Sequence, residues 1–256
     1  MTEQTPRVVV SGTYSTGKTT TATALSKATG IPLVRALSAR EILTSLYPGR
    51  KFHHMSAEEL LALGLRRLEE RLKAETELYD EGFISDGSVL NEWAYAAVRT
   101  RIGLNPGAPV LQQIVKAAWT IPSLPFLKRY VRAYGVMARL HARETYTDVV
   151  HLPVEFDMAS DGHRPVSERY RTLSDRDLHG EFTALGLKVH TVRSTIEARV
   201  QTIIDTLGLP HVCPVDKAVF DAKEEIAQSR EAVAQRILEQ DTPLMLRERA
   251  ALIFRL

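Results

Sequence analysis

The sequence predicts an α/β fold in three layers, with helices on both faces of a parallel sheet. Short apolar runs typical of buried strands alternate along the chain with longer segments of helical periodicity. Such alternation requires crossover connections, which place successive strands parallel in one sheet. The first apolar run, residues 8–11, leads directly into a glycine-rich turn and a helix. The 256 residues are enough for one domain of this kind with a large core and an appendage.

The glycine-rich turn, residues 12–19, has the sequence Gly-Thr-Tyr-Ser-Thr-Gly-Lys-Thr and matches the P-loop pattern G-x-x-x-x-G-K-[ST] completely. In this pattern the glycines let successive backbone N–H groups curl closely around a polyphosphate. Lys18 then reaches the outer phosphates, Thr19 can bind Mg²⁺, and the helix that follows offers its positive N-terminal end. The sequence therefore predicts a nucleoside triphosphate site formed by Gly12, Thr13, Tyr14, Ser15, Thr16, Gly17, Lys18, Thr19 and Thr20.

The remaining elements follow in order along the chain. The helix after the P-loop is expected over about residues 18–28, followed by a short strand at 32–34 and a helix at 39–46. Ser56 and Glu59 form a capping-box pattern, which predicts the start of a long helix. Apolar runs predict three further strands, at residues 82–86, 148–152 and 187–192. Ligands of parallel sheets bind at the carboxyl ends of the strands, so we expect the site at that edge.

Asp86 ends the predicted strand at residues 82–86 and is the second candidate for chemistry. In proteins with a P-loop, a carboxylate at a neighbouring strand end binds Mg²⁺ directly or through water, or takes a proton from the acceptor. The alternative is an aspartate that caps the helix expected to begin near Ser88. We favour the first interpretation, because the P-loop needs a carboxylate partner. Thr19 and Asp86 are therefore the predicted Mg²⁺ ligands, and Lys18 and Asp86 the first predicted catalytic residues.

A segment rich in arginine lies between the fourth and fifth predicted strands. It reads Asp161-Gly162-His163-Arg164-Pro165 and is followed by Arg169 and Arg171. A mobile loop here would close over the phosphates, exclude water and stabilise the charge of the transferred group. A solvated basic loop explains the same residues equally well, since arginines are common on surfaces. Arg164 and Arg171 complete the set of predicted catalytic residues.

Residues 103–146 form a predicted helical insertion in the first domain, which spans residues 1–207. One apolar stripe precedes Pro122 and Pro125, and a second follows them on a helix that also carries basic residues. The first stripe consists of Val110, Leu111, Ile114, Val115, Ala118 and Trp119, and the second of Phe126, Leu127, Tyr130, Val131, Tyr134, Met137 and Leu140. Three interpretations remain open: a hairpin packed on the core, a cap that selects an anionic acceptor, and a helix on a membrane surface.

After residue 207 the alternation of strands and helices stops. Residues 208–256 are predicted to form a helical extension, with helices at about 216–238 and 244–254. An isolated helix with an apolar face needs a partner surface. That surface is either the rest of the domain or a second copy of the chain, so a homodimer through the C-terminal helices is one of two expectations.

Composition and charge narrow the choice of partners and location. The formal charge of +2 gives no sign of a strongly electropositive face, so no nucleic acid partner is expected. The single cysteine, Cys213, excludes an internal disulfide and fits the reducing cytoplasm, so the chain is expected to be cytoplasmic. No apolar run approaches the length of a membrane span, so no stable membrane insertion is expected. His53, His54 and His163 lack metal-ligand spacing and are expected on the surface or in loops.

Four segments, in the order found here, resemble one known family. They are the P-loop with its preceding Val10-Ser11, residues 39–43 (Ala-Arg-Glu-Ile-Leu), residues 84–95 beginning Ile-Ser-Asp-Gly-Ser, and residues 161–171 with their arginines. Over about residues 6–207 the chain resembles the AAA-type P-loop NTPases and kinases related to the nicotinamide-riboside kinase domain and, more distantly, to nucleoside and thymidylate kinases. The resemblance implies a five-stranded parallel sheet in the nucleoside-kinase order, with Arg164 and Arg171 in a lid.

The same resemblance implies that Asp86 is the Mg²⁺-binding or catalytic carboxylate, and that Ser194 and Thr195, after the last strand, border the adenine. Two positions depart from the family pattern. Gly87 stands where an arginine commonly follows the aspartate, and Ala36-Leu37-Ser38 stands where acidic residues are usual. Both departures concern the acceptor rather than the nucleotide.

We therefore expect transfer of a phosphoryl group from ATP, with Mg²⁺, to a small-molecule acceptor that is nucleoside-like or another metabolite. A nucleotide-dependent switch that uses GTP is less favoured, because the guanine-reading motif N-K-x-D occurs nowhere in the sequence. An ATPase that drives a conformational change in a protein partner is the other alternative, and the absence of an arginine after Asp86 keeps it open. The sequence does not name the acceptor, since one scaffold serves many substrates.

Overall fold

The computed structural model describes residues 5–49, 55–102, 124–155 and 168–240. In this part of the chain one sheet is formed by β1 (Arg7–Ser11), β2 (Leu33–Val34), β3 (Phe83–Asp86), β4 (Asp148–His151) and β5 (Lys188–Thr191). The strand order is β2-β3-β1-β4-β5, and every neighbouring pair is parallel. The predicted five-stranded parallel sheet is thereby confirmed. Its central strand, β1, delivers the chain into the P-loop.

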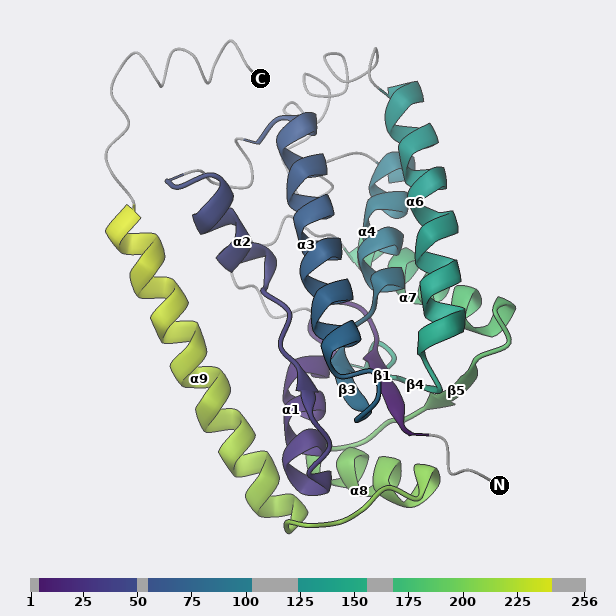
Figure 1. Ribbon diagram of the computed structural model, residues 1–256, viewed down its shortest axis with the longest axis vertical. Helices are drawn as coiled ribbons and strands as arrows, with labels where there is room; N and C mark the ends of the chain where they lie inside the picture. The colour runs from purple at the N-terminus through teal and green to yellow at the C-terminus, as the bar shows by residue number, and fades with distance from the viewer. Residues whose placement is uncertain (1–4, 50–54, 103–123, 156–167, 241–256) are drawn as a thin grey trace.

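Helices cover both faces of the sheet (Figure 1). α1 (Lys18–Thr29), α8 (Ile196–Leu207) and α9 (Val215–Gln240) lie on the side toward which Val8 and Val10 of β1 point. α3 (Ala57–Glu77), α4 (Val89–Ile102), α6 (Leu124–Thr145) and α7 (Glu168–Ala184) lie on the other side, with Val9. This alternation follows from the two-residue period of a strand. The three valines have no exposed surface, so β1 contributes to both cores.

Two helices begin at capping boxes, and one of these was predicted. The Ser56 hydroxyl accepts from the N–H of Glu59, whose carboxylate accepts from the N–H of Ser56, and α3 starts there as expected. The same reciprocal pair, formed by Ser38 and Glu41, starts α2 (Ala39–Leu46). Each box satisfies N–H groups that the first turn leaves without helical partners. The boxes thus fix the first residues of α2 and α3.

α6 packs on α4 with a face that differs in part from the predicted stripe. Phe126, Met137 and Leu140 of that stripe are 61%, 61% and 45% exposed, so these three residues lie outside the packed face. The buried face instead contains Leu127, Val131, Tyr134, Gly135, Ala138 and Ala142. This packing supports the interpretation of the second helix as part of an insertion packed on the core. The first predicted stripe, residues 110–119, lies outside the described residues, as do His53, His54 and His163.

Gly135 explains why the packed face of α6 is rich in small residues. A β-carbon at this position would lie 2.5 Å from Nε1 of Trp93 on α4, so a larger residue would push the two helices apart. The indole N–H of Trp93 donates to the carbonyl oxygen of Val131 at 2.8 Å. Close approach of the helices therefore satisfies a buried donor and decides which residues α6 buries.

α9 packs along α1 through its N-terminal half. Ala218, Val219 and Ala222 are buried in the core cluster that also holds Val8 and Val10. Of the two partner surfaces expected for the C-terminal extension, this part of the helix uses the domain itself. The second helix of the extension, predicted at residues 244–254, lies outside the described residues. Among the helices that the structure describes, none is both long enough and apolar enough to cross a membrane.

Candidate functional site

The candidate site lies at the carboxyl ends of β1 and β3, which pair in parallel with Val10 opposite Asp86. Residues 12–17 connect β1 to α1. Gly12 has a φ of 142°, and a β-carbon there would lie 2.4 Å from the carbonyl oxygen of Leu152, so only glycine fits. Gly17 has a φ of 85° and forms the N-cap of α1. The positive N-terminal end of α1 therefore follows directly on the loop, as anion binding requires.

Side chains from other elements hold the carbonyl groups of the P-loop. The donor and acceptor pairs are Asn91 Nδ2 with Gly12 O (3.0 Å), Tyr95 Oη with Gly12 O (3.3 Å), Arg171 Nε with Tyr14 O (3.0 Å) and Arg199 Nη1 with Thr16 O (2.8 Å). In a trans peptide the N–H of the next residue points away from the carbonyl oxygen. These contacts therefore turn the following amides away from the donors, in the direction that a bound phosphate needs.

Thr19 and Asp86, the two predicted Mg²⁺ ligands, lie next to each other. Thr19 Oγ1, in the first turn of α1, donates to Asp86 Oδ2, at the end of β3, over 2.7 Å. The ammonium group of Lys18 donates to the carbonyl oxygen of Thr13 and so lies against the loop itself. A hydroxyl and a carboxylate therefore lie side by side where β1 and β3 end, and their role as Mg²⁺ ligands stays a prediction.

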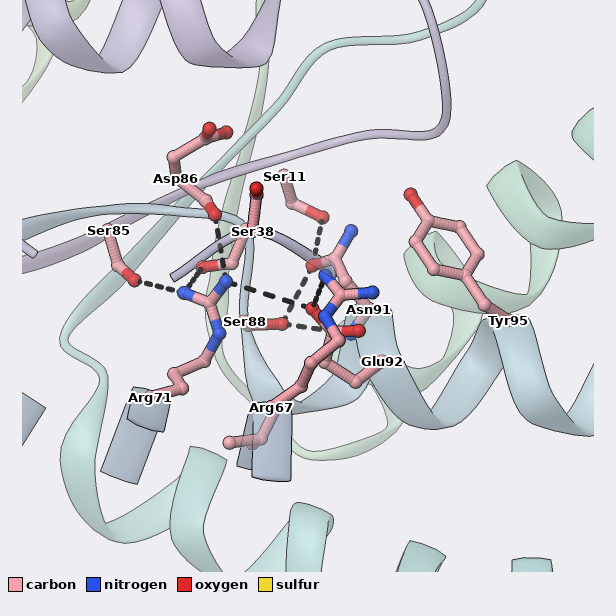
Figure 2. A network of polar contacts seen from close by, with 12 residues as sticks. Ser11, Ser38, Arg67, Arg71, Ser85, Asp86, Ser88, Asn91, Glu92 and Tyr95 are labelled. Atoms are coloured by element: carbon pink, nitrogen blue, oxygen red, sulfur yellow. Dashed lines mark hydrogen bonds and ion pairs between the residues drawn. The ribbon is translucent and has the colours of Figure 1, made fainter. Parts of the chain in front are cut away.

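Arg71 of α3 holds the turn that follows Asp86 (Figure 2). Its guanidinium donates to Ser85 Oγ at 2.8 Å, to the carbonyl oxygen of Asp86 at 3.1 Å and to that of Gly87 at 3.2 Å. Gly87 has a φ of 83°, a left-handed conformation in which other residues are strained. A β-carbon there would meet its nearest neighbours at 3.7 Å, so the backbone conformation, and not lack of space, favours glycine. An arginine at position 87 would be strained, and α3 brings a guanidinium to the turn instead.

Two carboxylates with little exposed surface balance the charge of Arg71. Glu75 and Glu92 each lie 3.8 Å from its guanidinium, and Glu92 also pairs with Arg67 at 2.5 Å. Burial lowers the pKa of Arg71, but the surrounding acidic groups, Glu75 and Glu92 foremost, together outweigh burial and leave this pKa above its ordinary value. Glu75 has no exposed surface and accepts a hydrogen bond from the Tyr146 hydroxyl at 3.1 Å. Arg71 is therefore a buried cation that is fixed between two elements.

Two tyrosines, Tyr95 and Tyr170, pack against Tyr14 of the P-loop. Tyr14 stacks on Tyr95 with 4.6 Å between ring centroids, and its ring lies 6.1 Å from that of Tyr170. Burial raises the pKa of Tyr95 and of Tyr170 well above the ordinary value, so both hydroxyls remain donors at neutral pH. The Tyr170 hydroxyl donates to the carbonyl oxygen of Tyr95 at 3.0 Å. Tyr95 and Trp93 are both buried and belong to the core.

The prediction that Arg171 lies on a mobile loop was wrong. α7 begins at Glu168, so Arg171 belongs to a helix, and it has no exposed surface. Its Nη1 atom lies 3.5 Å from Glu168, and its Nε atom is bound to the P-loop. The sequence pattern did not reveal this helix, because the segment is highly charged and the buried face of the helix includes two polar residues, Arg171 and Ser174. Arg164 lies outside the described residues, so its role in a lid stays a prediction.

Ser194 and Thr195 lie between β5 and α8. Both are exposed, and Ser194 has a φ of 105°. The Thr195 hydroxyl accepts from the N–H of Ala198 at 3.3 Å and caps α8. Thr195 thus has a structural role at the start of the helix, and the predicted contact of both residues with adenine stays a prediction.

Sequence reasoning missed three residues that shape this site, namely Arg71, Asn91 and Arg199. A weak signal exists for Arg71, because Arg67, Arg71 and Glu75 recur at intervals of four along the predicted long helix. Such spacing places them on one face, next to the leucines of the same helix. No comparable local signal marks Asn91 or Arg199, since their partners lie 79 and 183 residues away along the chain.

Comparison with known proteins agrees with this geometry. A search of curated proteins gave no match. Among solved structures, the chain is similar to a deoxyadenosine kinase from M. mycoides with the products dCMP and dCDP bound, at a TM-score of 0.51 and 15% identity, over 79% of this chain and 98% of that chain. At this identity the likeness concerns the fold, and it agrees with the predicted α/β P-loop architecture. The family model for an AAA domain matches residues 7–199, from β1 into α8. The chain therefore belongs to the AAA domain family of P-loop proteins.

Proposed function

We propose that the chain is an ATP- and Mg²⁺-dependent kinase that transfers a phosphoryl group to a small-molecule acceptor. The observation that carries the proposal is the 2.7 Å contact between the Thr19 hydroxyl and the Asp86 carboxylate, at the end of a P-loop against which the ammonium of Lys18 lies. Phosphoryl transfer needs a cradle for the β- and γ-phosphates, a metal site at its mouth and a carboxylate near the acceptor. Residues 12–19 supply the cradle. Thr19 and Asp86 supply the metal site, and Asp86 also supplies the carboxylate.

The donor atoms present fit Mg²⁺. Thr19 Oγ1 and Asp86 Oδ2 are hard oxygen ligands, and Mg²⁺ in nucleotide sites takes one or two protein oxygens beside water and phosphate oxygens. Mg²⁺ bound there would supply positive charge to offset the charge that develops on the phosphates. Thr19 and Asp86 would hold the metal, and Lys18 would turn from the Thr13 carbonyl to the outer phosphates.

The acceptor is proposed to approach Asp86 from the side of α3 and α4. Arg67 and Glu92 lie on that side with 26% and 9% of their side chains exposed (Figure 2). These groups recognise hydroxyls and other polar atoms. The carboxylate of Asp86 takes the proton of the attacking hydroxyl or orients it. A nucleoside-like molecule or another hydroxylated metabolite fits this chemistry, with ATP preferred over GTP because the N-K-x-D motif is absent from the sequence.

A screen of acceptors with γ-labelled ATP tests the proposal. Label found on a hydroxylated small molecule, and lost in the Lys18→Ala variant, supports a kinase. Release of free phosphate alone, in the presence of every acceptor tried and increased by a protein from the same cell, would instead support an ATPase that acts on a partner. Mg²⁺ dependence is read from the same assay by titration of the metal in the presence of a chelator.

A further inference from the structure

Arg199 of α8 is a buried cation that contacts the backbone of the P-loop. Its residue is 2% exposed, its Nη1 donates to the carbonyl oxygen of Thr16 at 2.8 Å, and a β-carbon on Gly17 would lie 3.3 Å from the same nitrogen. Its other terminal nitrogen, Nη2, pairs with the carboxylate of Glu155, in the segment that follows β4. One planar guanidinium thus joins α8, the P-loop and the segment after β4.

The position of this contact in the loop gives it a consequence for phosphate binding. The carbonyl of Thr16 and the N–H of Gly17 belong to one peptide unit, in which they point in opposite directions. A donor that holds the carbonyl outward therefore holds that N–H inward, just before Lys18 begins α1. Glu155 keeps the guanidinium in place by a second, charge-assisted hydrogen bond, so the arginine is fixed before any ligand arrives.

We propose that Arg199 is a positioning residue for triphosphate binding: it orients the Thr16–Gly17 peptide of the P-loop and is itself held by Glu155. The inference rests on the triphosphate-binding part of the proposed function and not on transfer to an acceptor. Arg199 reaches the phosphates only through the peptide that it holds, so its loss weakens phosphate binding without removing a phosphate ligand.

The test compares the full chain with the variants Arg199→Met and Arg199→Lys. Arg193→Met is the matched control, because Arg193 lies 3.7 Å from the same carboxylate but its side chain is 63% exposed. Calorimetry with Mg²⁺ and inorganic tripolyphosphate reads the phosphate site alone, and thermal unfolding reads stability. We expect Arg199→Met to bind tripolyphosphate about tenfold or more weakly, as loss of a hydrogen bond from a charged donor predicts. The amides of residues 13–18 should also exchange hydrogen faster without ligand, while Arg193→Met changes neither measurement.

The double variant Arg199→Met with Glu155→Gln distinguishes two roles of Arg199: orientation of the P-loop, and neutralisation of Glu155 in a structural ion pair. If Arg199 serves only to neutralise Glu155, removal of that charge restores both stability and tripolyphosphate affinity, and the inference is overturned. If it orients the loop, stability recovers but affinity does not. Wild-type affinity in Arg199→Met also overturns the inference. If Arg199→Met does not fold, Arg199→Lys decides in its place: weaker binding at an unchanged melting temperature supports the inference, and wild-type binding overturns it.

Failure of the proposed function has a different signature. A wild-type chain that binds no tripolyphosphate overturns both the kinase proposal and the role of Arg199. A wild-type chain that binds tripolyphosphate but transfers no phosphoryl group overturns the kinase proposal alone, and the comparison of the Arg199 variants still decides the inference.

Discussion

The Thr19 hydroxyl and the Asp86 carboxylate form a 2.7 Å hydrogen bond between the first turn of α1 and the end of β3. They meet because β1 and β3 are parallel neighbours, so that both strands end at the same edge of the sheet. A metal held by the nucleotide phosphates at this edge would contact both oxygens. The pair thus links the nucleotide half of the site to the half in which the acceptor is proposed to bind.

Asp86→Asn should separate binding from turnover. The amide keeps the shape of the side chain but removes the charge that organises Mg²⁺ or accepts a proton, and either role contributes about 10²–10⁴-fold to a rate. We expect much of the ATP affinity to remain, while turnover falls by about two orders of magnitude or more. Calorimetry and a single-turnover assay measure the two effects. Lys18→Ala is the contrasting variant, because its main loss should be in triphosphate affinity. Near-normal turnover in Asp86→Asn would reduce Asp86 to a structural residue.

Gly87→Arg should not raise turnover, although the family that the sequence resembles commonly has an arginine at this position. The φ of 83° imposes strain on any residue with a β-carbon, at a cost of about 1–2 kcal/mol. We expect Gly87→Ala and Gly87→Arg to lose similar amounts of unfolding free energy in urea, because the cause lies in the backbone that they share. If Gly87→Arg is as stable as the wild type and more active, Arg71 does not replace the missing guanidinium.

The contacts of α9 predict a small acid-dependent loss of stability. Glu225 lies 2.8 Å from Lys27 of α1 and 3.0 Å from Arg35, and these partners, Lys27 foremost, lower its pKa. A lowered folded-state pKa contributes stability above the unfolded value of about 4.3, and this contribution is lost as the pH falls through the folded-state pKa. The pair is partly exposed, so Glu225→Gln should cost only about 0.2–1 kcal/mol at pH 7. Unfolding of both proteins between pH 7 and pH 3 should show this difference shrink below pH 4.3, and a constant difference would contradict it.

Local patterns in the sequence identified most residues of the candidate site. The P-loop is one contiguous segment whose glycines are required by its own backbone, so its residues reveal its shape without reference to the rest of the fold. Asp86 was found because the rule that ligands bind at strand ends needs only the order of the strands. The capping box at Ser56 was equally local. In each case the physical cause lies within a few residues of the motif.

The residues that were missed or misplaced depend on packing between distant elements. Arg199 meets Thr16 only because α8 crosses behind the loop, and Arg71 meets Gly87 only because α3 ends alongside β3. On α6, apolar character suggested that Met137 is buried, but the close approach of α4 at Gly135 selects small residues for the contact instead. Sequence periodicity identifies the apolar residues of a helix, but it does not reveal which neighbouring helix packs closely against it.

Arg71→Met should destabilise the fold and impair turnover, for separate reasons. The change leaves Glu75 and Glu92 without their common partner, and removal of one member of a buried ion pair costs about 3–5 kcal/mol. It also removes the hydrogen bonds to the carbonyl oxygens of Asp86 and Gly87 that fix the direction of the carboxylate. Arg67→Met is the matched control for stability, because Arg67 also pairs with Glu92 but its side chain is 26% exposed. Its cost should stay near that of an exposed pair, about 0.2–1 kcal/mol.

The two effects of Arg71→Met are distinguished by the double variant with Glu75→Gln. Removal of the second charge relieves a carboxylate that has lost its guanidinium partner and has no exposed surface, so urea denaturation should show that part of the lost free energy returns. Turnover should not return, because the carbonyl oxygens of the turn still lack their donor and Asp86 is no longer held in place. A double variant that recovers turnover together with stability would show that Arg71 acts on the fold alone. A double variant that recovers stability while its turnover stays low, at an ATP affinity close to that of the wild type, would identify the turn after Asp86 as the part of the site that Arg71 controls.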